Sequence, residues 1–263
     1  MIKTEIKYKG KKYIKEIPES WEECKLSNVI RLEAMPEDND LIDVLCCFID
    51  LPKEIIDNTS SNLWQPLFKI LEFVYNPPKW TALKRPSKLQ LNGKLVKVPS
   101  NLGMETFGQK VLALQAIEKH KQKLSGLPEL LTIYLQPKYD GKYSRMRQGA
   151  VRELVDNTLA IESIPIGLFF LQEVAKAEEL WNVRFKEIPK DIAQDNLFFQ
   201  SGGERLGPYN DLIIIDSLAK LYGYSHDEVF HLEWDFINNL LYVHQLQDHI
   251  KEKMNKLHKT LHK

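Results

Sequence analysis

Residues 8–18 read YKGKKYIKEIP, and residues 91–99 read LNGKLVKVP. Each stretch contains a residue pair that ends in glycine, a short run of β-prone residues and a closing proline. A pair of this kind between two runs of alternating polarity predicts a β-hairpin with a tight turn. Apolar residues at helical spacing follow both stretches, so the sequence predicts two related modules, each a β-hairpin followed by helices.

A second pair of similar stretches lies further along the chain. Residues 44–53 read VLCCFIDLPK and residues 129–138 read ELLTIYLQPK, and their prolines lie 85 residues apart. The glycines of the two hairpin turns lie 83 residues apart. This nearly constant separation predicts an internal duplication. Two similar units more often build binding surfaces than one asymmetric active site.

These patterns divide the chain into four segments. The first module covers residues 1–85, and the second covers residues 86–190. A connector with several glycines, residues 191–211, leads to a helical region at residues 212–263. The predicted fold is therefore mainly α, with two related β-hairpin-plus-helices modules followed by a C-terminal helical part with a long final helix.

Capping patterns predict several helix ends. Ser20 and Glu23 predict a helix start after the first hairpin, and Ser225 and Glu228 predict another start near the C-terminus. The helix before that second start begins near residue 210 and is predicted to end at Gly223. The helices predicted for the second module cover residues 105–123, 128–135, 143–157 and 164–185.

The charges of the chain balance but are unevenly distributed. The 36 basic and 36 acidic side chains give a net charge of zero. Residues 1–15 carry a net charge of +5, residues 16–57 of −9 and residues 79–97 of +6. Such blocks favour acidic and basic surfaces that meet between modules or between copies. A nucleic-acid-binding domain would usually be basic as a whole, so no nucleic-acid partner is predicted.

The cysteines and the apolar runs predict the compartment. Cys24, Cys46 and Cys47 are odd in number and two are adjacent, which suits buried thiols in a reducing compartment rather than disulfides. The longest apolar runs are too short to span a bilayer, and the N-terminus has no apolar signal region. We therefore expect a soluble protein made inside the cell, with no membrane partner.

The sequence contains no motif that predicts catalysis or small-ligand binding. It has neither a P-loop nor a G-x-G-x-x-G segment. His258 and His262 have the spacing of two ligands on one helical face. They lie in a lysine-rich tail without a carboxylate partner, so a solvated tail is predicted. The sequence thus predicts no enzyme, no catalytic residue, no cofactor and no metal site.

The last helix has the most regular pattern in the chain. From residue 236 onward, apolar side chains recur at steps of four and three residues, interrupted only at Gln247. A 3.5-residue repeat of this kind makes a narrow apolar seam for another helix. Docking of the seam against the chain's own body is the alternative to a partner. The predicted partner-binding residues are Phe236, Leu240, Val243, Ile250, Met254 and Leu257.

Four segments resemble proteins of tailed bacteriophages. Residues 21–24 (WEEC), which follow a hairpin and a proline, are similar to the opening of small helical proteins of these phages. Residues 104–109 (METFGQ) and 131–137 (LTIYLQP) resemble two further segments of those proteins. Residues 217–229 (SLAKLYGYSHDEV) resemble the helix-turn-helix in the C-terminal part of tail assembly chaperones. The chain departs from that family because its opening module occurs twice and no frameshift boundary is visible between its parts.

The resemblance implies a non-enzymatic function. Tail assembly chaperones keep the tape-measure protein soluble while the tail tube forms around it. The implied partner is therefore the tape-measure protein or another tail or virion component, and the implied location is the cytoplasm of the bacterial host during assembly. Alternatives are a virion structural protein of the connector, tail or capsid, a regulatory or inhibitory protein-binding module, and a hydrolytic enzyme with a site across the repeats. A homo-oligomer also stays open.

Overall fold

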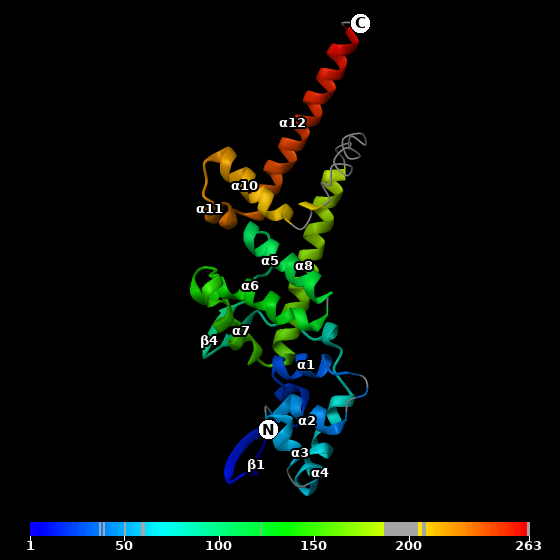
Figure 1. The fold of residues 1–263 in the computed structure, drawn as a ribbon, viewed down its shortest axis with the longest axis vertical. Helices are drawn as coiled ribbons and strands as arrows, with labels where there is room; N and C mark the ends of the chain where they lie inside the picture. Colours follow the sequence, from blue (N-terminus) through cyan, green and yellow to red (C-terminus); the bar gives the residue numbers. More distant parts are fainter. Residues whose placement is uncertain are drawn as a thin grey trace. The chain divides into compact units, whose positions relative to one another are not determined.

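The computed structural model describes residues 1–36, 38, 40–49, 51–58, 61–121, 123–186, 205–206 and 209–261 (Figure 1). It is 69% helical, with two small antiparallel β-hairpins and a C-terminal helical part that ends in a long helix. The predicted fold class is therefore confirmed. Most of the predicted connector, residues 191–211, lies outside the described residues.

Both hairpins form where their turn residues predict them. β1 (Ile2–Tyr8) pairs with β2 (Lys11–Ile17), and β3 (Lys88–Leu91) pairs with β4 (Lys94–Lys97). Both turn residues have positive φ in each hairpin, 45° and 75° in the first and 45° and 78° in the second. Two consecutive positive φ angles define the type I′ turn, whose twist matches that of the paired strands. Glycine at the second position adopts this conformation without a Cβ clash.

The chain packs as two compact units, of which unit 1 comprises Met1–Ser100 and Ala116–Leu171. At its core lies α6 (Leu127–Asp140), in which every side chain from residue 130 to residue 136 is buried. Short 3-10 turns connect several of its elements. Besides α6 and the four strands, unit 1 contains α1 (Leu26–Glu33), α2 (Leu41–Ile49), α3 (Lys53–Asp57), α4 (Ser61–Ile70), α7 (Gln148–Asp156) and the first part of α8 (Ala160–Lys186).

Two predictions for unit 1 were wrong. Ser20 does not cap a long helix, because only a 3-10 turn, Trp21–Glu23, follows it and α1 begins at Leu26. The Trp21 indole is instead buried and donates hydrogen bonds of 3.0 Å to two backbone carbonyls after α4. The predicted end of α6 at residue 135 was also wrong. The helix passes through Pro137 and ends at Gly141, which has a φ of 86°.

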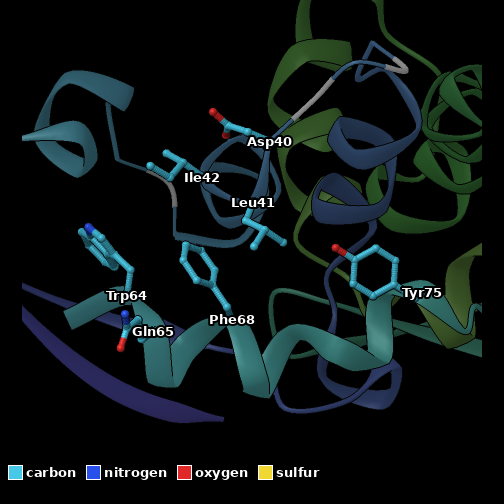
Figure 2. Close-up of a pocket in the computed structure, with 7 residues that line it drawn as sticks. All are labelled: Asp40, Leu41, Ile42, Trp64, Gln65, Phe68 and Tyr75. Carbon is cyan, nitrogen blue, oxygen red and sulfur yellow. The ribbon is translucent and has the colours of Figure 1, made fainter. Parts of the chain in front are cut away.

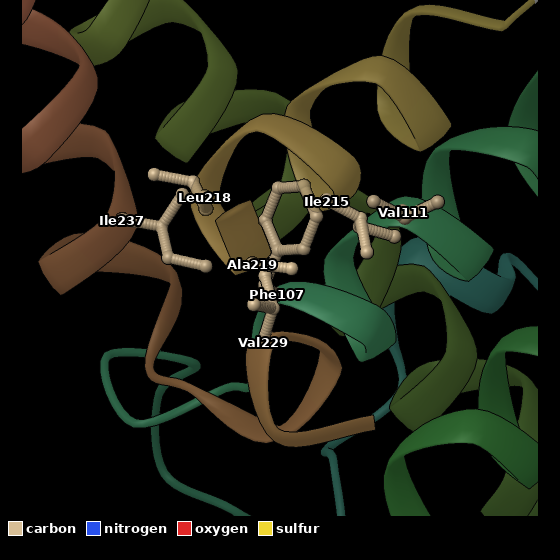
Figure 3. Packing of buried hydrophobic residues seen from close by; sticks show 7 residues of the cluster. All are labelled: Phe107, Val111, Ile215, Leu218, Ala219, Val229 and Ile237. Atoms are coloured by element: carbon tan, nitrogen blue, oxygen red, sulfur yellow. The ribbon is translucent and has the colours of Figure 1, made fainter. Parts of the chain in front are cut away.

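Unit 2 comprises Asn101–Gln115 and Gln172–Lys263. It contains most of α5 (Phe107–His120), the second part of α8, α10 (Asn210–Tyr222), α11 (His226–His231) and α12 (Trp234–Leu261). Its core is a cluster of buried apolar side chains from α5, α10, α11 and α12 (Figure 3). The members of this cluster are Phe107, Val111, Ile215, Leu218, Ala219, Val229 and Ile237.

The helix ends predicted for unit 2 are confirmed. α10 spans residues 210–222 and ends at Gly223, which has a φ of 73°. The Ser225 hydroxyl accepts a hydrogen bond of 3.2 Å from the Glu228 N–H, and the Glu228 carboxylate accepts one of 2.8 Å from the Ser225 N–H. This reciprocal capping box starts α11.

An arrangement of helices and a short backbone bridge occurs once in each unit. In unit 1, Lys25 pairs with Leu159 in an isolated antiparallel bridge, closed by two backbone hydrogen bonds of 2.8 Å. In unit 2, Thr106 pairs with Glu233 in the same way, with bonds of 2.7 and 2.9 Å. Each bridge joins the start of one helix, α1 or α5, to the start of the unit's long helix, α8 or α12.

The elements before each long helix also follow the same order. A helix (α6 or α10) ends at a glycine with positive φ, a short helix (α7 or α11) follows, and the bridge residue then precedes the long helix. By this recurrence, α1, α6, α7 and α8 correspond in turn to α5, α10, α11 and α12. The similar stretches of the sequence did not predict this correspondence. The similar stretches 44–53 and 129–138 have different local structures, because Pro52 precedes α3 whereas Pro137 lies inside α6. The predicted module boundaries stay a prediction.

Candidate partner-binding surface on the last helix

The first turns of α12 are fixed in the core of unit 2. Ile237 is fully buried, and Leu240 and Leu241 pack partly buried against the same cluster. The indole of Trp234 stacks on the ring of Phe107, with centroids 5.5 Å apart and an interplanar angle of 17°. Burial of these large side chains ties the start of α12 to α5.

The segment Thr106-Phe107-Gly108 builds the contact between α5 and α11. The Thr106 hydroxyl accepts a 3.2 Å hydrogen bond from the Gln109 N–H and so caps α5. Phe107 is 1% exposed and occupies the core. A Cβ atom at Gly108 would lie 2.0 Å from the Phe230 ring, so only glycine allows this approach. Thr106 and Phe107 therefore help to position the start of α12, through the bridge to Glu233 and the stacking on Trp234, and Gly108 allows α11 to approach α5.

A buried lysine on α5 links it to the second part of α8. Lys110 is fully buried, and its Nζ donates a 3.0 Å hydrogen bond to the Val174 carbonyl. The carboxylates of Glu105 and Glu178 lie 3.9 and 3.7 Å from this nitrogen. Burial lowers the pKa of Lys110, and the two carboxylates oppose that shift. Sequence patterning did not predict this group, because a lysine in a polar helix is usually on the surface.

The lowered pKa of Lys110 predicts a pH dependence of stability. Its folded-state pKa lies below the ordinary 10.5, so between these two values the unfolded chain binds more protons than the folded one. The free energy of unfolding of the wild type should therefore rise with pH across that window, relative to Lys110→Met. Urea unfolding of both proteins from neutral pH to about 10.5 measures this. Parallel pH profiles of the two proteins would contradict the prediction.

The second part of α8 runs parallel to α12 within unit 2. The Trp181 indole donates to the Asp235 carboxylate at 3.4 Å, and the Arg184 guanidinium donates to the Asn239 side chain at 2.9 Å. One turn further, the Arg184 guanidinium lies 4.4 Å from the ring centroid of Tyr242. Because the residue numbers increase together along both helices, the two helices point the same way.

Five of the six predicted partner-binding residues are exposed, on one face of α12. Their steps of seven, seven, four and three residues keep them on that face. Leu240 is the exception, because it packs partly buried against the core of unit 2. We name the exposed set the α12 face, and it consists of Phe236 (45% exposed), Val243 (46%), Ile250 (49%), Met254 (54%) and Leu257 (64%).

Two exposed residues of α8 extend this surface and were missed from the sequence. Leu180 and Val183 are 64% and 57% exposed. They come one residue before Trp181 and Arg184, the two residues of α8 that contact α12. One residue corresponds to a rotation of about 100° around the helix axis. On α12, Phe236 and Val243 follow the contacting residues by one position. On one helix the exposed residues come before the contacting residues, and on the other they come after them. In two parallel helices that face each other, this places all four side chains on the same side of the helix pair.

Unit 1 carries a separate apolar cavity between α2 and α4 (Figure 2). Its volume is about 620 Å³. The Trp64 indole in its wall donates to the Ile56 carbonyl at 3.1 Å, which leaves its ring as apolar lining. The lining is mostly apolar, with Asp40, Gln65 and Tyr75 as its polar residues. The lining residues are Asp40, Leu41, Ile42, Trp64, Gln65, Phe68 and Tyr75.

The cysteines are free thiols in unit 1. Cys24 and Cys47 are buried, as predicted, whereas Cys46 is half-buried. Burial raises the pKa of Cys24 to about 12 and that of Cys47 to about 11, and it also raises the pKa of Cys46. Within the described ranges, no three histidine, cysteine or acidic side chains gather to hold a metal ion. Of the two histidines considered from the sequence, His262 lies outside those ranges.

These thiols predict an order of modification in the native protein. The thiolate is the reactive form, so a raised pKa and burial both slow alkylation. Iodoacetamide at mildly alkaline pH should therefore modify Cys46 before Cys24 and Cys47, and unfolding in urea should make all three reactive. Peptide mass spectrometry after a time course measures the order. Early modification of Cys24 in the native protein would contradict it.

Comparison of the chain with models of protein families, with curated proteins and with solved structures found no match. A search for membrane-spanning helices in the described part of the chain found none that is both long and apolar enough.

Proposed function

We propose that this chain is a non-enzymatic assembly factor of a tailed bacteriophage, a tail assembly chaperone that binds the tape-measure protein. The observation that carries the proposal is the row of exposed apolar side chains along the α12 face. The client in this account is a helical segment of the tape-measure protein. Binding would take place in the cytoplasm of the bacterial host during tail assembly.

The physical argument rests on what a long helical client needs. An amphipathic helix that has no partner exposes its apolar stripe to water and tends to aggregate. A chaperone can cover that stripe by laying a matching apolar helix face along it, with anchors at intervals of three, four and seven residues. The α12 face offers anchors at these intervals over several helical turns. Leu180 and Val183 of α8 widen the same surface.

Two of the four segments that resemble proteins of tailed bacteriophages support the proposal through their structural roles. Residues 104–109 form the start of α5, which packs against the first turn of α12. Residues 217–229 form the end of α10, the glycine turn and the capped start of α11. Both segments thus build the unit that presents the α12 face.

The test compares protein capture with virion composition. The affinity-tagged chain is expressed in infected cells, its bound proteins are identified by mass spectrometry, and purified virions are analysed in parallel. We expect the tape-measure protein among the bound proteins and this chain to be absent from virions. Stoichiometric amounts of the chain in virions would instead support a virion structural protein. Capture of a host protein without any tail component would support a regulatory module.

A further inference from the structure

We propose that the partner helix on the distal part of α12, residues 243–261, is acidic and amphipathic. This inference rests on the proposed function, because it names the class of helix that binds the same surface. It is drawn from the exposure of the α12 face and from the charges that flank it.

The distal part of α12 is exposed. Within it, Ile250, Met254 and Leu257 are 49%, 54% and 64% exposed. An amphipathic partner helix would cover these three side chains.

The charges beside the α12 face select the partner. In a heptad with Val243 and Ile250 at d, residues 251 and 253 occupy the flanking e and g positions, and both are lysines. Asp248 lies 3.6 Å from the Lys251 Nζ, but both side chains are more than 70% exposed, so this pair is weak. Over residues 243–261, four lysines stand against two acidic residues. A partner with glutamate or aspartate at its own e and g positions meets opposite charges.

The same positions disfavour a second copy of this chain as the occupant. From residue 244 to residue 258, the e and g positions of α12 hold only histidine, lysine and leucine. Two copies that paired through this face would bring no carboxylate to the lysines in either a parallel or an antiparallel dimer. The observations therefore favour a different, acidic helix over self-association.

The experiment uses the full chain and two designed helical peptides. Both peptides carry leucine at every a and d position, and they differ only in having glutamate or lysine at e and g. Fluorescence anisotropy should show that the glutamate peptide binds at least about tenfold more tightly, with a difference that shrinks as salt rises. The double variant Lys251→Glu with Lys253→Glu should prefer the lysine peptide.

The outcomes separate this inference from the proposed function. Equal binding of the two peptides would overturn the inference even if the tape-measure protein is captured from infected cells. Preference for the glutamate peptide would uphold it even if no tape-measure protein is captured, in which case the proposed function fails alone. Light scattering should give a monomer. A dimer that Leu257→Asp converts to a monomer would identify a second copy as the occupant and overturn the inference.

Discussion

Ile250→Asp is expected to weaken binding of the client at least about 100-fold, which corresponds to about 2.7 kcal/mol. Ile250 lies at the middle of the α12 face and is half exposed in the unbound chain. In the complex a carboxylate at this position would be desolvated next to apolar side chains, where no hydrogen bond compensates it. Titration of a labelled client segment with the wild type and the variant measures the change in affinity.

Two controls separate binding from folding. Met146→Asp places the same charge at a 98% exposed apolar residue of unit 1, and it should leave affinity unchanged. Ile237→Asp places it in the core of unit 2, and it should unfold that unit. Leu240 is unsuitable for this comparison because it contacts the core as well. Loss of helicity in Ile250→Asp, of the size seen in Ile237→Asp, would show that the α12 face is part of a core.

Phe107→Ala is expected to lower the stability of unit 2 by about 3–5 kcal/mol, because it removes a buried ring and leaves a cavity. The ring is 1% exposed and stacks on Trp234 at the start of α12. Loss of this contact should also make the start of α12 less firmly packed against the core of unit 2, so client binding should weaken. Hydrogen exchange followed by mass spectrometry measures the effect for each unit separately.

Phe236→Ala is the matched control for this prediction. It removes the same side chain from α12, at a position that is 45% exposed. We expect it to reduce client binding with little change in the hydrogen exchange of unit 2. If Phe107→Ala left the exchange of α10, α11 and α12 unchanged, the described core of unit 2 would be wrong.

The sequence predicted those features that local chemistry decides. The turns at Gly10 and Gly93 need positive φ, which glycine adopts readily, so their hairpins could be recognised from a few residues. Gly223 and the Ser225 capping box end and start helices for equally local reasons. The spacing of apolar residues along α12 is also a local pattern, and five of the six residues predicted from it are exposed.

Features that tertiary packing decides could not be predicted in this way. Ser20 had the spacing of a cap, but burial of the neighbouring Trp21 indole against two carbonyls left only a 3-10 turn there. The helix predicted over residues 128–135 stops before Pro137, but α6, whose residues 130–136 are all buried, continues through this proline to Asp140. Lys110 is a charged residue that the fold buries, because the Val174 carbonyl and the Glu178 carboxylate of α8 meet it there, together with the nearby Glu105 carboxylate.

The role of the α12 face is tested most directly by site-specific photocross-linking in infected cells. A benzoylphenylalanine residue replaces Leu257 in one variant and Met146 in the other, since both side chains are exposed but only the first lies on the α12 face. Ultraviolet irradiation followed by mass spectrometry identifies the attached protein. The account predicts a covalent adduct with the tape-measure protein from position 257 and none from position 146. Equal adducts from both positions, or no tape-measure adduct from position 257, would contradict it.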